Sequence, residues 1–110
     1  MEKRKRVLLS SSFENDLQTI YESGVDTFGF RAAEFYKLYL LSLVYKLDDF
    51  YLIYPECRHI LTKIRRYRNI ILDSHIIIYR ITPERIEVLR VLHSHSSITK
   101  IRGSRSIKIK

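Results

Sequence analysis

Two adjacent segments, His75-Ile-Ile-Ile-Tyr-Arg-Ile81 and Arg85-Ile-Glu-Val-Leu-Arg-Val-Leu-His93, decide the fold of this 110-residue chain. Both are rich in β-branched and aromatic residues, which favour strands, and Thr82-Pro83-Glu84 between them is typical of a turn. The run Ile76-Ile77-Ile78 has no polar alternation, so we expect a central strand that is buried on both faces. In the second segment, alternation predicts that Ile86 and Val88 share one face, and that Glu87, Leu89 and Val91 share the other.

The residues before these segments predict one more strand of the same sheet. Tyr67 to Leu72 has strand composition, and Asp73-Ser74 separates it from the next segment by a turn. A loop from Pro55 collects basic residues ahead of this strand.

The N-terminal half instead predicts a short strand followed by two helices. Lys5 to Ser10 is β-compatible, and Ser11 with Glu14 forms a Ser-x-x-Glu capping box at a helix start. Apolar residues at helical spacing continue this helix to about Ser23, and Gly24 should end it. Asp26 or Thr27 can cap a second helix. Its broad apolar face is formed by Ala32, Phe35, Tyr36, Tyr39, Leu40, Leu43, Val44 and Leu47.

The predicted element order is β-α-α-β-β-β, an α+β fold in which one antiparallel sheet packs on an α-helical hairpin. We expect residues 1–96 to form a single domain. Residues 97–110 are polar and basic, and their Ile-Lys-Ile-Lys end has no evident core partner, so we expect a C-terminal tail that is in large part mobile or waits for a partner.

The charge of the chain points to an acidic partner for its C-terminal half. The total is 20 Lys and Arg against 12 Asp and Glu, a net charge of +8. Residues 12–49 hold three bases and seven acids, a balance of −4, whereas residues 50–110 hold 13 bases and 4 acids, a balance of +9. A polyanion or an acidic protein should therefore meet the second half.

Several classes of protein are excluded by composition. The single Cys57 leaves neither an internal disulfide nor a multi-cysteine zinc site. The longest apolar stretch, Tyr36 to Leu47, is interrupted by Lys37, Ser42 and Lys46, whereas a bilayer span needs about 20 apolar residues. With no signal-peptide pattern, we expect a cytoplasmic protein that does not enter a membrane.

The two opening segments resemble the end of ParE-type toxins, whose pattern is a His, several β residues, Tyr-Arg, a turn, and then Ile-x-Val-x-Arg-Val-Leu-His. Ser10 to Ile20 is similar to the family's Ser-x-x-Phe-x-x-Asp-Leu-x-x-Ile helix, and Tyr67-Arg68-Asn69-Ile70 resembles its Tyr-Arg strand opening. The similarity to the RelE/ParE superfamily spans about Val7 to His95 and is closest to the ParE branch.

This resemblance implies the toxin of a type II toxin–antitoxin system, with a cognate antitoxin that wraps around it in a hetero-oligomer. An acidic antitoxin would match the basic half of the chain. ParE-type members are known for acting on DNA gyrase and carry the description plasmid stabilisation, whereas RelE-type members enter the ribosome and cut mRNA. The resemblance implies no cofactor.

Ribonuclease chemistry is where the chain departs from the RelE pattern. RelE-type members have an Arg in the third strand and another just after the fourth, and these positions are Ile76 and Ser94 here. Their downstream Tyr has no counterpart, because nothing after Tyr79 is aromatic. If the chain nevertheless cleaved RNA, its candidate catalytic residues would be Arg68, Arg90, His93 and His95, which could supply cations and proton transfer.

Binding is the alternative role for the basic residues. The cluster around Tyr67, with arginines suited to bidentate anion contacts, suggests a surface for the target or the antitoxin. The candidate contact residues are Arg58, Lys63, Arg65, Arg66, Arg68, Arg80, Arg90 and His93. A purely structural interpretation also stays open for Arg80 and Arg90, in which the side chain is solvated or pairs across strands, for example with Glu87. His93 and His95 lack a third ligand nearby, so we expect no metal.

Three functions therefore remain open from sequence: a ParE-like toxin that inhibits gyrase by binding, a ribosome-dependent endoribonuclease, and an inactive member that only binds its antitoxin.

Overall fold

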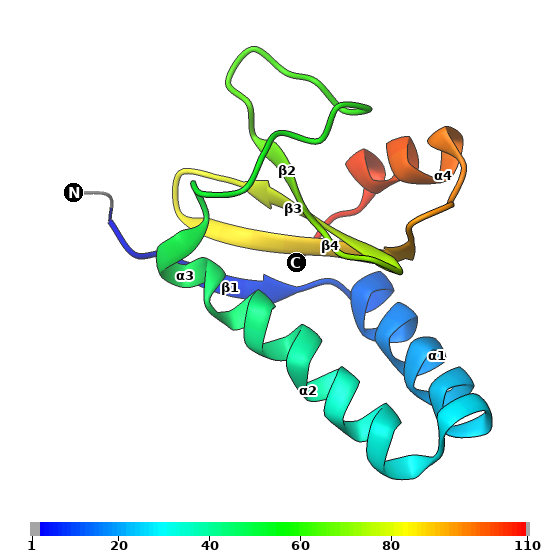
Figure 1. Ribbon diagram of the computed structural model, residues 1–110. Helices are drawn as coiled ribbons and strands as arrows, with labels where there is room; N and C mark the ends of the chain where they lie inside the picture. Colours follow the sequence, from blue (N-terminus) through cyan, green and yellow to red (C-terminus); the bar gives the residue numbers. More distant parts are fainter. Residues whose placement is uncertain (1–2, 110) are drawn as a thin grey trace.

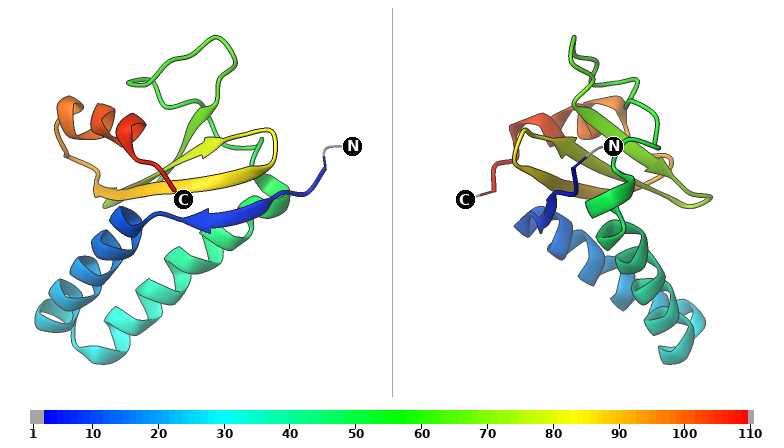
Figure 2. Two further views of the ribbon diagram at one scale, coloured as in Figure 1. Left: turned by 180° about the vertical axis from the view of Figure 1, so that it is seen from behind. Right: turned by 90° about the vertical axis from the view of Figure 1, so that its left-hand side faces the viewer.

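The computed structural model describes residues 3–109, which form a four-stranded sheet with a helical hairpin on one face and two shorter segments on the other (Figures 1 and 2). The elements in chain order are β1 (Arg6–Leu9), α1 (Ser11–Phe28), α2 (Phe30–Tyr45), α3 (Leu47–Phe50), β2 (Tyr67–Ile71), β3 (His75–Ile81), β4 (Arg85–His93), α4 (Ile98–Arg102) and a 3-10 turn, η1 (Gly103–Ser106). This order confirms the predicted α+β arrangement.

The strands lie in the order β1-β4-β3-β2. The two pairs made by β2, β3 and β4 are antiparallel, as predicted, but β1 runs parallel to β4, with Val7 opposite Ile86. The expectation of an entirely antiparallel sheet is wrong at this edge. A parallel pair needs a long crossover between its strands, and the helices and the other two strands provide it.

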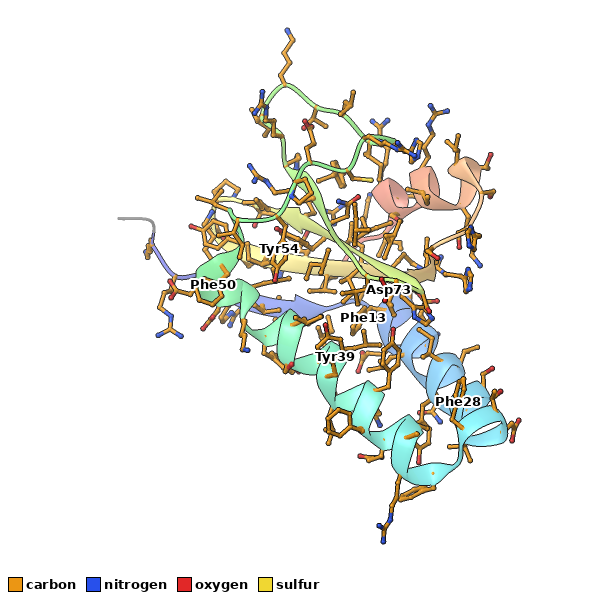
Figure 3. All side chains as sticks on the ribbon, viewed as in Figure 1. Phe13, Phe28, Tyr39, Phe50, Tyr54 and Asp73 are labelled. Atoms are coloured by element: carbon orange, nitrogen blue, oxygen red, sulfur yellow. The ribbon has the colours of Figure 1, made fainter. Side chains whose placement is uncertain are left out.

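Both faces of the sheet are buried, as the run of isoleucines in β3 predicts. Ile77 and Tyr79 pack with Phe13 of α1 and Leu40 of α2 in the main core, and Phe13 lies between the hairpin and the sheet in Figure 3. Their neighbours in β3 point the other way. On that face Ile78 packs with the following residues of β2, β4, the loop after α3 and the C-terminal segment: Cys57, Ile60, Tyr67, Leu89, Leu92 and Ile101.

A β-bulge in β4 changes which residues share a face. Ile78 pairs with Arg90 and the next residue, Tyr79, pairs with Val88, so Leu89 has no partner across the ladder. One extra residue on one strand reverses the alternation beyond it. Val91 therefore joins Val88 in the main core, and the prediction that Val91 shares a face with Leu89 is wrong.

The helix that follows β1 begins one residue earlier and ends later than the sequence predicts. Ser10 is the N-cap, and its Oγ accepts a hydrogen bond from the Phe13 amide at 2.9 Å. Gly24 does not end the helix. A Cβ at Gly24 would lie 3.2 Å from the Cβ of Ala33, so the absence of a side chain there allows α1 and α2 to approach closely.

Gly29 makes the turn between the two helices instead. Its φ of 91° is in the region that favours glycine, and α2 starts at the next residue with no side-chain cap, so neither Asp26 nor Thr27 caps it. The helix α2 buries a narrower face than predicted, because Phe35 and Tyr39 are exposed. No helix within residues 3–109 has the length and apolar character needed to cross a membrane.

The C-terminal segment packs on the sheet, contrary to the expectation that it has no core partner. Ile101 of α4 is only 4 % exposed, and Ser104 of η1 is fully buried. Ser97 caps α4 by accepting a hydrogen bond from the Lys100 amide at 3.1 Å. The sequence did not predict this packing, because Ile101 contacts the face of the sheet opposite the hairpin and no local sequence pattern indicates that contact.

We expect Ser10→Ala to destabilise the protein by about 2 kcal/mol, because it removes the cap of α1 and a partner of a buried carbonyl. The Ser10 Oγ donates to the Leu89 carbonyl oxygen at 2.6 Å, next to the bulge. Urea unfolding would measure the loss. Ser11→Ala is the matched control and should change the unfolding free energy by less than about 0.5 kcal/mol. A larger loss in Ser11→Ala than in Ser10→Ala would restore Ser11 as the cap.

Candidate functional site

Arg90, one of the expected contact residues, is paired inside the molecule. Its Nε and Nη2 donate to the two carboxylate oxygens of Asp16 at 2.6 and 2.8 Å. The Val91 amide also donates to Asp16, at 3.1 Å. Because this carboxylate lies on α1, the pair joins the helical hairpin to β4, and the Nε/Nη2 edge of the guanidinium is occupied by a bidentate contact.

Arg80 belongs to a second internal ion pair, on the opposite face of the sheet. It pairs across the strands with Glu87, at 2.6 Å between Nε and Oε1, as one sequence interpretation allowed. Arg85 donates from Nε to the other carboxylate oxygen of Glu87, at 2.8 Å. Burial alone would raise the pKa of Glu87, but the hydrogen bonds from the two arginines outweigh it, and the pKa lies below its ordinary value.

The same two arginines hold the C-terminal segment. Arg80 Nη2 donates to the Ile107 carbonyl at 2.8 Å, and Arg85 Nη2 donates to the Ile109 carbonyl at 2.7 Å. We refer to Arg80, Arg85 and Glu87 as the arginine clasp. Its carboxylate orients both guanidinium groups towards the backbone of residues 107–109.

Arg68 is also engaged within the chain. Its Nη1 donates to the carbonyls of Leu52 and Tyr54, both at 3.0 Å, which fixes the start of the loop after α3. In the strand register, Arg68 lies opposite Tyr79 of β3, whereas His93 lies opposite His75 of the same strand. Tyr79 and His75 are four residues apart along β3. Four residues of a strand span about 13 Å, so Arg68 and His93 do not converge on one phosphate.

The exposed bases instead gather on the face of the sheet opposite the hairpin. There the loop of residues 51–66 and the segment of α4 and η1 lie over the strands (Figure 1), and Arg102 Nε donates to the His59 carbonyl at 3.4 Å between them. The exposed members of this basic face are Arg58, Lys63, Arg65, Arg102 and Arg105. Arg66 is half-buried, with its guanidinium carbon 5.8 Å from the centre of the Tyr67 ring.

A groove of about 740 Å³ lies on the hairpin side, between α1, α2 and the ends of β3 and β4. Apolar side chains, including Ile20, Ala33 and Val91, form much of its wall. Polar and titratable residues also line it: Asp16, Tyr36, Ser74, His75, His93 and Lys100. An apolar groove with a few polar groups is typical of a site for a helix or a small ligand.

Histidines form a cluster at one end of this groove. The rings of His75 and His93 are 5.9 Å apart, and those of His93 and His95 are 5.3 Å apart. The Tyr36 hydroxyl lies 2.7 Å from His75 Nδ1. Burial, together with the nearby His93, lowers the pKa of His75.

Sequence reasoning assigned no role to His75, although it begins the segment that decides the fold. Counting back from the turn at residues 82–84 would have placed it opposite Leu92, and only the bulge brings it opposite His93. The groove could not be found in this way, because α1, α2 and two strand ends form it together. Within residues 3–109, no group of three or more His, Cys, Asp or Glu residues is arranged to hold a metal ion.

Comparison with known proteins identifies this arrangement. Residues 7–98 match the family described as ParE toxin of type II toxin–antitoxin system, parDE. A solved structure described as the chromosomal ParDE TA system from P. aeruginosa contains a chain similar to this one. The TM-score is 0.69 at 16 % sequence identity, over 82 % of this chain and 96 % of that chain. At this identity the likeness shows a shared fold. The search of curated proteins gave no match.

We expect Asp16→Ala to destabilise the protein by about 2 kcal/mol, because it leaves the half-buried Arg90 without its partner. The loss should lie below the roughly 3–5 kcal/mol of a fully buried pair, since solvent reaches this one. Glu22→Ala, which removes an exposed acid from the same helix, is the matched control. Equal urea midpoints for the two variants would show that the Asp16 pair adds no stability.

The lowered pKa of His75 predicts that stability is lost as the solution becomes acidic. The unfolded chain binds a proton near the ordinary pKa of 6.5, whereas the folded protein resists protonation. Stability should therefore be complete above pH 6.5 and decrease as the pH falls towards the folded value. Urea midpoints at about pH 7.5, 6.5 and 5.5 would measure this. The slope should shrink in His75→Gln and persist in His95→Gln, and an unchanged slope in His75→Gln would contradict the assignment.

Proposed function

The chain belongs to the ParE toxin family of type II toxin–antitoxin systems, and we propose that it inhibits DNA gyrase by binding, in the cytoplasm, until a cognate acidic antitoxin neutralises it. The target is proposed on the resemblance of the sequence to the ParE branch. The mode of action, binding without chemistry of its own, is proposed on the structure.

One observation carries the proposal of binding. Of the arginines that a ribonuclease could use, Arg68 donates to backbone carbonyls and Arg90 is bound to a carboxylate. Ile76 and Ser94 occupy the positions at which RelE-type members have arginines. Cleavage of RNA needs cations that stabilise the crowded phosphate, and guanidinium groups already engaged in hydrogen bonds within the protein are poor candidates for that role.

The basic face is the surface that we propose for the target. Its bases are exposed, whereas three other expected contact residues, Arg68, Arg80 and Arg90, make hydrogen bonds within the fold. Clustered positive charge raises the rate of association with an acidic surface and needs no base-specific contact.

We propose that the antitoxin occupies the groove. Its apolar wall suits one side of an amphipathic helix, and His93 and Lys100 at its edge suit acidic residues at the end of that helix. Target and antitoxin would then use opposite faces of the sheet within a toxin–antitoxin hetero-oligomer. Exclusion of gyrase would follow from the bulk of the antitoxin rather than from competition for one surface.

A ribosome-dependent endoribonuclease remains the second candidate, because of the histidine cluster. His75 and His93 lie 5.9 Å apart beside Lys100 in the groove, and imidazoles near neutral pH can donate and accept the protons that cleavage of RNA moves. Translating ribosomes incubated with the protein test this candidate directly. Cuts in the mRNA with gyrase unaffected would replace gyrase as the target, and a chain that is harmless on expression would be an inactive member of the family.

We expect the purified protein to block supercoiling by gyrase and to leave cleaved DNA. The double variant Arg58→Glu/Lys63→Glu should need about tenfold more protein for half inhibition, since two charges of the basic face then repel the target. Supercoiling of a relaxed plasmid measures the effect. Lys3→Glu/Arg6→Glu is the matched control, because it reverses two exposed bases on the N-terminal side of the chain. Equal losses in both variants would mean that net charge, and not the basic face, determines inhibition.

A further inference from the structure

The outer side of α2 presents an apolar stripe that the sequence assigned in part to the core. Phe35, Leu38 and Tyr45 are 77 %, 56 % and 54 % exposed, and they lie along one line of the helix with Ser42. Their spacing of three, four and three residues keeps them on one side of a helix. The opposite side, with Ala33, Leu40 and Val44, packs on α1 and the sheet. We refer to residues 35, 38, 42 and 45 as the outer stripe.

Exposed apolar residues aligned in this way mark a protein interface, and the surrounding charge narrows the choice of partner. The charges around the stripe balance, since residues 30–50 hold three bases and three acids: Arg31, Lys37, Lys46, Glu34, Asp48 and Asp49. This surface therefore offers no net attraction for an acidic antitoxin or a nucleic acid, and none of the four residues of the stripe lines the groove. The partner must be apolar along its contact and must match charges of both signs at its ends.

The stripe is complementary to itself when the helix direction is reversed. About a centre at Leu40, Phe35 falls opposite Tyr45 of a second copy, and Leu38 falls opposite Ser42. Large residues thus face an aromatic ring or a small side chain, so that Leu38 can enter the space above Ser42. We propose that the outer stripe binds the outer stripe of a second copy of this chain, as an antiparallel α2–α2 dimer with two-fold symmetry.

The charges at the ends of the stripe agree with this register. Arg31 before the stripe falls opposite Asp49 of the second copy, in α3, which continues from the end of α2 (Figure 1). At 100° per residue, Arg31 lies on the same line as the stripe, and Asp49 follows the stripe just beyond the Lys46 junction between α2 and α3. Both residues are exposed, and neither forms an ion pair with any other residue of the range 3–109. Two equivalent pairs, one at each end, would fix the antiparallel direction.

The size of the contact sets its strength. A helix of 16 residues is about 24 Å long, so one helix pair buries less than the roughly 800 Å² per partner of a standard interface. We therefore expect a dimer with a dissociation constant of tens of micromolar. This dimer does not depend on gyrase as the target, because the groove and the basic face remain open in it.

Sedimentation equilibrium of the purified chain between about 1 and 300 µM tests the dimer. The wild type should shift from monomer to dimer across this range, and Leu38→Glu should remain monomeric with an unchanged circular dichroism spectrum. Leu61→Glu is the matched control, because Leu61 is 68 % exposed on the loop of the opposite face, and it should dimerise as the wild type does.

A charge exchange tests the register. Arg31→Asp and Asp49→Arg should each weaken dimerisation about fivefold, and the double variant should regain the wild-type constant, because the pair re-forms with its signs exchanged. The proposal is overturned if the wild type stays monomeric at the highest concentration, or if Leu38→Glu dimerises normally. It is also overturned if the double variant is no better than the single ones. A monomeric wild type whose antitoxin binding is lost in Leu38→Glu would assign the stripe to the antitoxin.

Discussion

The burial of β3 on both faces is the constraint on which the rest of the molecule depends. Ile77 and Tyr79 need a cover on one side and Ile78 on the other, so a helical hairpin alone cannot complete the fold. The loop after α3 and the C-terminal segment provide the second cover. Because these two segments carry most of the exposed bases, the need to bury apolar surface is also what assembles the basic face.

The sequence predicted the strands and the hairpin because their signals are local. β-branched runs and helical spacing do not depend on distant residues, so element order and fold class followed from them. The details that were wrong depend on contacts far along the chain. Gly24 lies inside α1 and packs closely against Ala33 of α2. Leu89 forms a bulge in β4, and Ile101 packs on the face of the sheet opposite the hairpin.

The candidate site was predictable in its residue types and much less in its geometry. The sequence identified arginines and histidines near the strand ends, and their chemistry limits them to anion contacts, ion pairs or proton transfer. Which of these applies depends on partners that spacing does not reveal. Arg90 meets a carboxylate 74 residues earlier in the chain, and the groove arises only when the hairpin and the strand ends come together.

The arginine clasp holds main-chain oxygens, and this has an evolutionary consequence. Carbonyl groups are present at every position, so the side chain of Ile109 could be exchanged without loss of its hydrogen bond, whereas Ile107 also packs against the core on the back of the sheet. The side chain at position 109 can thus change while the path of the backbone over the sheet stays the same. Specificity for new partners can evolve there without any change in the scaffold beneath.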